Sequence, residues 1–355
     1  QIRPKNQISK LVFPSKDFDV LKIVILINTY LNVKDNYDQF TSHRNNSSEK
    51  DNHQEQNLLG WFEEWLCGRA QQVVLDGEIS QTSNVLSGVP QGTVLGPLCF
   101  LIFINDLGKN ISSQTSLKLF ADDSLLFRTI NNPDDCDILQ KDMNSLLSWA
   151  DQWQMNFHPE KCIVMSITNK RSPLHYDYSM SGHCLKRIES VRYLGVQLNA
   201  SLKWNHHIEL IVAKANRSLG FLRRNLYQCP EKVKEQAYKA LVRPILEYAC
   251  GAWDPHQQSH IKMVEQVQRT TARFVTNTRS NEPGSVTSAL EKLGWDSLQS
   301  RRKARRLKLL HQTVNVKTQG LRIPGYYENV NKYSTRNNHA AKFAFPSCRT
   351  EVRKK

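Results

Sequence analysis

The chain has 355 residues, enough for two or three domains that each bury a core of their own. Its 39% hydrophobic and 23% charged residues are typical of a globular protein, but 48 Lys and Arg against 33 Asp and Glu give a net charge of +15. This surplus favours a polyanionic partner, either nucleic acid or an anionic membrane face. The alternative, which charge alone does not reject, is that the excess charge only aids solubility.

The eight cysteines are scattered and form no CxxC pair, which argues against a zinc module and a disulfide-stapled secreted domain. No secretory signal opens the sequence, so we expect reduced thiols in an intracellular protein, in the nucleus or the cytoplasm. The apolar runs Val20–Ile27 and Leu95–Ile104 are shorter than the ~20 residues that span a bilayer. Nucleic acid is therefore preferred to a membrane as the partner.

Residues 1–57 are predicted to be a divergent, partly disordered N-terminal segment. One apolar run is followed by a tract from Lys34 to Gln56 that is rich in Asn, Asp, Ser, Gln and Lys. Such a tract buries too little apolar surface to offset the entropy of ordering.

Regular structure is expected from Leu58, where apolar residues at helical spacing predict a helix. Val73–Leu75 and Thr82–Leu86 predict a hairpin. The run Thr93–Leu107 is apolar almost all round, and this pattern predicts a helix buried on every side at the centre of a domain.

Two apolar strands around a short polar turn are predicted within Leu117–Phe127. Pro133 starts an amphipathic helix whose apolar side reaches Trp153. Cys162–Thr168 and Val191–Leu198 are expected to be further strands.

From residue 204 the hydrophobic period is helical, and helices are expected near 204–226, 231–250, 259–277 and 296–315. Pro244 should kink the second of them. The change from mixed to all-helical structure near residue 200 is the main predicted domain boundary.

The adjacent carboxylates Asp122 and Asp123 carry the first chemical signal. A simple polar hairpin turn is the alternative reading. However, two carboxylates at the tip of an apolar hairpin repel each other unless a cation neutralises them. Carboxylate oxygens suit Mg²⁺, and paired ions clamp the attacking and leaving oxygens of a phosphoryl transfer. The pair therefore predicts a metal site.

The segment Gly88–Pro97 carries the second signal. It reads as a Gly/Pro turn that caps a helix. Glycines on both sides of Gln91 also let backbone and amide approach a flat ligand closely, and a helix N-terminus attracts phosphate.

Together, GVPQGTVLGPLCFLIFINDL and the following LFADD resemble the central blocks of reverse transcriptases from non-LTR retrotransposons, particularly the jockey-like group. The resemblance covers roughly residues 58–315. Other segments that look like blocks of this family are Trp61–Gln72, Met155–Cys162, Tyr193–Val196, Tyr238–Tyr248, Leu293–Trp295 and Arg301–Arg302.

The resemblance implies an α/β (α+β) palm of a right-hand polymerase over 58–200, an all-α thumb with a C-terminal helical extension over 201–315, and a basic tail over 316–355. The implied activity is RNA-directed DNA polymerase, in which a primer 3′-hydroxyl attacks the α-phosphate of a deoxynucleoside triphosphate. An RNA template, a DNA primer and Mg²⁺ or Mn²⁺ are the implied partners and cofactor. The alternative is a catalytically inactive nucleic-acid-binding remnant of such a polymerase.

The resemblance also assigns roles by position. Asp122 and Asp123 would be catalytic and bind the metal, and Lys161 would donate a proton to pyrophosphate, with a solvated turn lysine as the alternative. The substrate-binding positions at the primer end, in the nucleotide pocket and in the primer grip would be Phe120, Ala121, Pro90, Gln91, Gly92, Leu194 and Gly195.

One family feature is not matched. The family carries a further catalytic carboxylate upstream, in a block resembling LDFSKAFD. The nearest text, Leu11–Asp19, places Phe13 at the catalytic position, and Asp17 and Asp19 do not fit the spacing. An incomplete carboxylate set predicts weak Mg²⁺ binding and little or no polymerase activity.

The predicted nucleic-acid-binding residues lie in the helical half, where six of the eight positions 301–308 are basic. Their concentration fits phosphate contacts along a template–primer duplex. A solvated helix face and a nuclear-import signal are the alternatives. The six are Arg301, Arg302, Lys303, Arg305, Arg306 and Lys308.

Overall fold

The computed structural model describes residues 21–30, 60–85, 88–168, 170–278 and 282–314. It divides the chain into two compact units, one of residues 18–189 and one that includes residues 190–355. We call them the sheet unit and the helical unit. The division falls before Ser190 rather than near residue 200, because the hairpin that follows Ser190 belongs with the helices.

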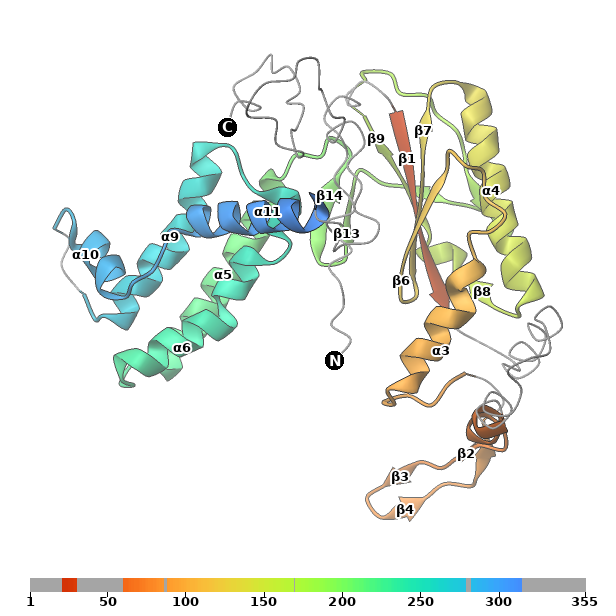
Figure 1. Cartoon of the computed structure of the whole chain (residues 1–355), viewed down its shortest axis with the longest axis horizontal. Helices are drawn as coiled ribbons and strands as arrows, with labels where there is room; N and C mark the ends of the chain where they lie inside the picture. The colour runs from red at the N-terminus through yellow and green to blue at the C-terminus, as the bar shows by residue number, and fades with distance from the viewer. Residues whose placement is uncertain (1–20, 31–59, 86–87, 169, 279–281, 315–355) are drawn as a thin grey trace, which may run out of the picture. The chain divides into compact units, whose positions relative to one another are not determined.

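The sheet unit is built on one mixed sheet (Figure 1). Neighbouring strands pair antiparallel, except for the parallel pair at the β12 edge. β8 (Asn156–Phe157) also pairs with the end of β1. The strand order is β12 (Lys186–Arg187), β9 (Ile163–Ile167), β1 (Leu21–Tyr30), β7 (Asp123–Ile130) and β6 (Ser116–Phe120).

The central strand β1 comes from the segment that the sequence analysis placed outside the palm. It lies between β7 and β9, and its Ile25 is fully buried. A central strand favours a continuous apolar run, which LKIVILI provides. The prediction for residues 1–57 is therefore corrected for Leu21–Tyr30; the rest of that segment lies outside the described residues.

Helix α4 (Pro133–Gln152) packs against the sheet and starts where the sequence predicted (Figure 1). Asn132 caps it: its side chain accepts from the backbone N–H of Asp135, whose carboxylate accepts from the Asn132 N–H in return. The helix buries Leu139 and Met143 completely. Each such side chain contributes roughly 1.5–3 kcal/mol by leaving water.

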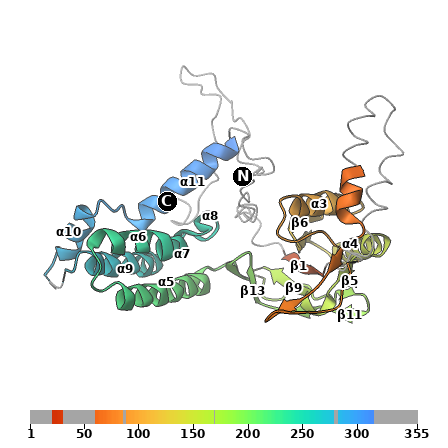
Figure 2. The ribbon, with the colours of Figure 1, turned by 90° about the horizontal axis from the view of Figure 1, so that it is seen from below.

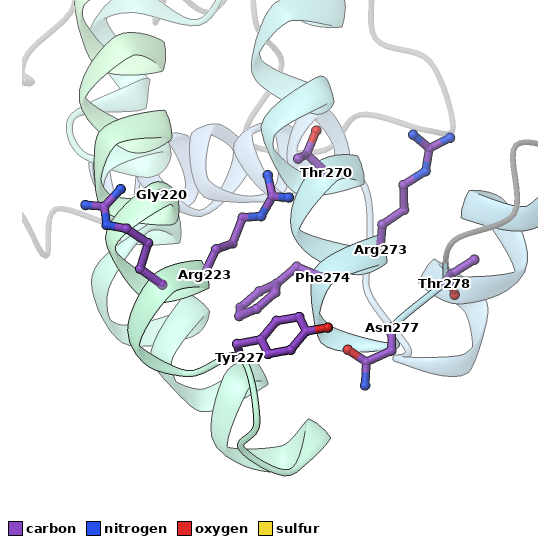
Figure 3. Close-up of a pocket in the computed structure, with 9 residues that line it drawn as sticks. Gly220, Arg223, Tyr227, Thr270, Arg273, Phe274, Asn277 and Thr278 are labelled. Carbon is purple, nitrogen blue, oxygen red and sulfur yellow. The ribbon is translucent and has the colours of Figure 1, made fainter.

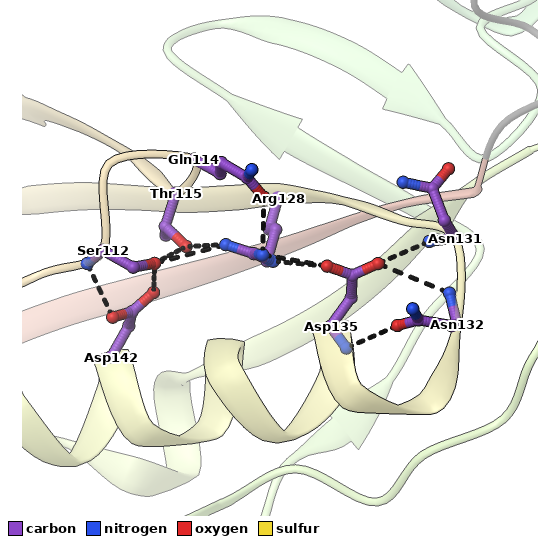
Figure 4. A network of polar contacts seen from close by, with 8 residues as sticks. All are labelled: Ser112, Gln114, Thr115, Arg128, Asn131, Asn132, Asp135 and Asp142. Carbon is purple, nitrogen blue, oxygen red and sulfur yellow. Dashed lines mark hydrogen bonds and ion pairs between the residues drawn. The ribbon is translucent and has the colours of Figure 1, made fainter.

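A buried polar network ties α4 to β7 and to the loop before β6 (Figure 4). The guanidinium of Arg128, 4% exposed, bonds to the Asp135 carboxylate at 2.8 Å and to the Ser112 hydroxyl. Asp142 accepts both the N–H and the hydroxyl of Ser112. Burial alone would raise the pKa of Asp135, but bonds from the Asn131 N–H and from Arg128 outweigh it and lower that pKa. The network thus joins the loop before β6 to the segment after β7 and to α4.

The prediction for the apolar run before the Asp pair was wrong in one respect. Helix α3 (Leu95–Phe103) forms, followed by the short helix η4 (Ile104–Asp106). However, Val94, Leu101 and Ile102 are exposed, at 85%, 53% and 56%. Apolar composition alone does not decide burial, because only one side of this helix packs on the sheet unit's core.

Short strands lie between residues 70 and 84. β3 (Val74–Leu75) pairs with β4 (Glu78–Ile79), and β2 (Ala70–Gln71) pairs with β5 (Ser83–Asn84). The predicted pairing was wrong: Val74–Leu75 pair with Glu78–Ile79 and not with residues 82–86, whereas Ser83–Asn84 pair with Ala70–Gln71. Residues 60–66 are helical, as predicted.

The helical unit opens with the hairpin of β13 (Ser190–Tyr193) and β14 (Val196–Asn199). Helix α9 packs against α5, α6, α10 and α11, and Figure 2 shows α5 and α9 side by side. The unit's helices are α5 (Asn205–Asn225), α6 (Glu231–Leu241), α7 (Arg243–Glu247), α8 (Cys250–Trp253), α9 (Gln258–Val275), α10 (Ser285–Lys292) and α11 (Leu298–Val314).

The predicted helices near 204–226, 259–277 and 296–315 correspond to α5, α9 and α11. The helix expected over 231–250 is broken into α6, α7 and α8, because Pro244 starts a new helix and Ala249 adopts a left-handed conformation. Helix α10 was not predicted. Across the described residues, no helix is both long and apolar enough to cross a membrane.

Candidate active site

The two aspartates lie at the tip of the β6–β7 hairpin. Phe120 ends β6 and pairs with Asp123, so Ala121 and Asp122 form a two-residue turn. Ala121 has φ = +50°, a left-handed conformation that is uncommon for a residue with a Cβ. Strand pairing on both sides holds this strained turn, and strain of this kind gathers at functional sites.

The carboxylates differ in their surroundings. Asp122 is exposed, whereas Asp123 is half-buried at the start of β7. Burial, and then the charge of Asp122, raise the pKa of Asp123. The protein therefore destabilises the ionised pair, which is the condition under which a bound cation gains most.

Position 28 lies directly opposite this pair in the sheet. In the antiparallel ladder of β1 and β7, Asn28 is the register partner of Asp123. Partners in such a ladder have Cβ atoms about 4.5–5.5 Å apart on one face of the sheet. The register partner of Asp123 in β1 is thus an asparagine and not an aspartate or a glutamate.

The other edge of β1 brings in the segment with Lys161. Thr29 pairs with Phe157 of β8, and Leu26 pairs with Ile163 of β9. Between these pairs the chain makes the short helix η5 (Pro159–Lys161), which contacts β1. Lys161 is exposed and stands in this insertion, between the segments that pair with Thr29 and with Leu26. The fold therefore gathers Asn28, Asp123 and Lys161 at one end of the sheet.

Among the described residues, the Asp pair provides part of a ligand set for the metal that the resemblance implies. Asp122 and Asp123 are two oxygen-donor ligands of the type that Mg²⁺ prefers. No cluster of three or more His, Cys, Asp or Glu that could hold a metal occurs among the described residues. Phe13, Asp17 and Asp19, considered above for the missing carboxylate, lie outside them.

The Pro-Gln-Gly segment forms a tight turn at the entrance of α3. Pro90 is half-buried, and Gln91 and Gly92 are exposed. The Thr93 hydroxyl donates to the Pro90 carbonyl at 2.9 Å and accepts from the N–H of Gly96 at 3.0 Å. A Cβ at Gly96 would stand 2.9 Å from the Pro90 oxygen, so only glycine fits there. The turn presents the Gln91 amide to solvent, and α3 lies at the end of the sheet where the Asp hairpin turns (Figure 1).

Leu194 and Gly195 belong to the helical unit, where they form the turn of the β13–β14 hairpin. Both have positive φ, +44° and +82°. The Tyr248 hydroxyl donates to the Leu194 carbonyl at 3.0 Å, and a Cβ at Gly195 would lie 3.1 Å from the Tyr248 ring. Tyr248 thus holds the tip of the hairpin predicted to be the primer grip.

The basic residues of α11 are largely engaged within the protein. Arg301 and Arg305 both bind the carboxylate of Glu247, which is 2% exposed. Arg302, fully buried, and Arg306 bind Asp254 at 2.7 and 3.1 Å. Lys303 and Lys308 have exposed side chains. Nucleic-acid contact by this helix stays a prediction; its arginines also hold α11 against α7 and α8.

Sequence reasoning missed Asn28. The letters of Ser15-Lys16 and Phe18-Asp19 resembled the family's upstream block, so the missing carboxylate was sought only in Leu11–Asp19, which lies outside the described residues. The better signal was physical: a continuous apolar run that ends in a polar residue predicts a central strand whose last residue reaches a site at the sheet's end.

Comparisons with known proteins agree with this geometry. Residues 27–198 match the family model described as reverse transcriptase (RNA-dependent DNA polymerase). The probable RNA-directed DNA polymerase from transposon X-element of Drosophila melanogaster is 27% identical over 227 residues, 61% of this chain and 25% of the relative. The RNA-directed DNA polymerase from mobile element jockey of Drosophila funebris is 27% identical over 223 residues, 59% of this chain and 24% of the relative.

The chain spans about a quarter of the length of the curated relatives it matches. The match begins inside β1 and ends in β14, so it contains the Asp hairpin, the Pro-Gln-Gly turn and the strand with Asn28. A reverse transcriptase domain implies a polymerase palm, and the mixed sheet with α4 against it agrees. Residues 27–198 are therefore similar to the reverse transcriptase domains of non-LTR retrotransposons, in particular those of the jockey-like group.

Proposed function

We propose that this chain supplies the palm, the thumb and a helical extension of an RNA-directed DNA polymerase. The sheet unit would be the palm, and α5 to α11 would be the thumb and extension. The proposed substrates are an RNA template, a DNA primer and deoxynucleoside triphosphates. The observation that carries the proposal is the arrangement around β1. The Asp hairpin pairs with one edge of β1, and η5 contacts this strand as well; the hairpin and η5 both lie within the residues that match the family.

The roles of the chain's own groups follow from their positions. Gln91, exposed at the entrance of α3, would contact the nucleotide or the template base. Exposed Lys161 would donate a proton to the departing pyrophosphate. Asp122 and Asp123 would be the ligands of a divalent cation, Mg²⁺ or Mn²⁺. Because Asn28 stands where a further carboxylate would complete the set, we propose that cation binding limits the activity.

The asparagine at position 28 also favours a second candidate function. If the missing carboxylate prevents cation binding altogether, the domain would bind nucleic acid without extending a primer. The basic surplus of +15 would serve this role equally well.

Primer extension on poly(rA)/oligo(dT) with Mg²⁺ or Mn²⁺ tests both candidates. Asn28→Asp should raise the extension rate above that of the unchanged chain. Asn156→Asp is the matched control, because it makes the same change at an exposed position of β8, two residues along β1 in the register. Asp122→Asn with Asp123→Asn should abolish any extension.

A second readout does not depend on activity. Without a cation, a third carboxylate at position 28 should lower the melting temperature by charge repulsion. Addition of 10 mM Mn²⁺ should then restore it in Asn28→Asp and not in Asn156→Asp, since a ligand that binds the folded state stabilises it. If Mn²⁺ restores the melting temperature of Asn28→Asp but this variant does not extend a primer, the polymerase proposal is refuted and the binding function remains. Extension by the unchanged chain, equal to that of Asn28→Asp, would refute the role given to Asn28.

A further inference from the structure

The helical unit contains a cavity of about 700 Å³ between the C-terminal turns of α5 and α9 (Figure 3). Arg223, Arg224 and Tyr227 line it from α5 and the turn that follows, and Arg273 and Phe274 line it from α9. Its size falls within the range of about 300–1,000 Å³ found for small-ligand sites.

The positive charge of this cavity is not neutralised by the residues that line it. Three arginines line it and no acidic residue does. None of the ion pairs found among the described residues involves Arg223, Arg224 or Arg273. The arginines of α11, in contrast, are each held by Glu247 or Asp254. Unneutralised guanidinium groups around a concave surface attract an anionic ligand, and their planar forks suit phosphate.

A further cation lies behind the aromatic wall. The ammonium of Lys234, 1% exposed, stands 5.1 Å from the centroid of the Phe274 ring and donates to Asn277 at 3.0 Å. Its positive charge adds to the potential inside the cavity, and the Asn277 bond fixes the loop that closes one side.

The aromatic residues give the cavity a flat apolar surface. Phe274 is half-buried between the helices, and Tyr227 lies beside it with 60% of its surface exposed (Figure 3). An exposed aromatic ring next to guanidinium groups is the arrangement that binds unpaired bases and their phosphates in single-stranded nucleic acid. An acidic polypeptide would use the charge but not the ring.

We propose that this cavity binds a single-stranded segment of nucleic acid, with phosphate on Arg223 and Arg273 and a base stacked on Tyr227. The site is distinct from the Asp hairpin, and binding there requires neither nucleotide nor divalent cation. It goes beyond the polymerase function proposed above and does not depend on it.

Binding of a fluorescein-labelled 12-mer oligo(U) to the whole chain, measured by anisotropy in EDTA, tests the proposal. Arg223→Gln with Arg273→Gln should weaken binding at least tenfold and reduce the salt dependence by about 1.4 in log–log slope, for two lost phosphate contacts. Lys232→Gln with Lys262→Gln removes the same charge from exposed positions on α6 and α9 outside the cavity and is the matched control.

The base contact is tested separately. Tyr227→Ala should weaken oligo(U) binding roughly tenfold and leave binding of an abasic 12-mer unchanged, whereas Tyr227→Phe should bind oligo(U) like the unchanged chain. An equal loss of oligo(U) affinity in the double arginine variant and in the double lysine control would overturn the proposal. Competition by polyglutamate as strong as that by unlabelled oligo(U) would overturn it in favour of an acidic polypeptide.

Binding by Asp122→Asn with Asp123→Asn should equal that of the unchanged chain, so a failure of the polymerase function leaves this result untouched.

Discussion

Buried His207 makes the stability of the helical unit depend on pH. Its side chain is 3% exposed and lies 5.2 Å from the Trp253 ring, centroid to centroid. The Nδ1 atom accepts the backbone N–H of Gln197 at 3.2 Å, so the ring must be neutral with its proton on Nε2. Burial, followed by the charges of Arg192 and His206, lowers the pKa of His207 to about 4.

The magnitude follows from the two pKa values. In the unfolded chain the pKa of His207 is near 6.5, so the unfolded state takes up a proton first as the pH falls. The stabilisation by the neutral ring is complete above pH 6.5 and is lost between pH 6.5 and about 4. The difference corresponds to about 3 kcal/mol in all, and to about 2 kcal/mol between pH 6.5 and 5.

Urea unfolding followed by circular dichroism, at pH values from 7.5 to 5, measures this effect. His207→Gln keeps an acceptor for the Gln197 N–H and removes the titrating group, so its free energy of unfolding should change about 2 kcal/mol less over this window. His206→Gln, at an exposed neighbouring position, should follow the unchanged chain. If His207→Gln loses stability with falling pH as steeply as the unchanged chain, the assignment of a buried neutral ring is refuted.

Three further predictions concern stability and are measured by urea unfolding at pH 7. Gly96→Ala should lose about 1–3 kcal/mol, because its Cβ would stand 2.9 Å from the Pro90 carbonyl; no loss would mean that the turn moves freely. Asp135→Asn should lose about 3 kcal/mol by leaving buried Arg128 without its ion pair. Because the pKa of Asp135 is lowered, the unchanged chain should lose this advantage as the pH falls below about 4 and the variant should not. Glu247→Gln should lose about 2 kcal/mol by weakening its bonds to two arginines of α11, and a loss below 0.5 kcal/mol would show that these bonds contribute little.

Local patterns predicted the elements whose partners are near in sequence. The β6–β7 hairpin, α4, α5 and α9 formed close to where period and capping residues placed them. The Asp pair came with its hairpin, because apolar strands on both sides of a polar turn are a local signal. The hairpin contains four of the predicted active-site residues, Phe120, Ala121, Asp122 and Asp123.

Three features could not be predicted from local sequence patterns. β1 pairs with strands far along the chain, so no local pattern could show that Asn28 meets Asp123. The exposed side of α3 depends on what lies around it, which composition does not encode. The pairing of α11 arginines with Glu247 and Asp254 also joins distant segments, so the run of basic residues could not show that these arginines hold α11 against α7 and α8.

The place of β1 in the sheet has a consequence for folding. The first strand of the sheet in sequence order is its central one, and its neighbours β7 and β9 begin only at Asp123 and Ile163. Until β1 inserts between them, both strands present unpaired backbone edges, which are prone to pair with other chains. Contacts that span so much sequence close slowly, since the entropy of ordering the intervening chain comes before any gain. We therefore expect slow refolding of the sheet unit, with aggregation as the competing reaction.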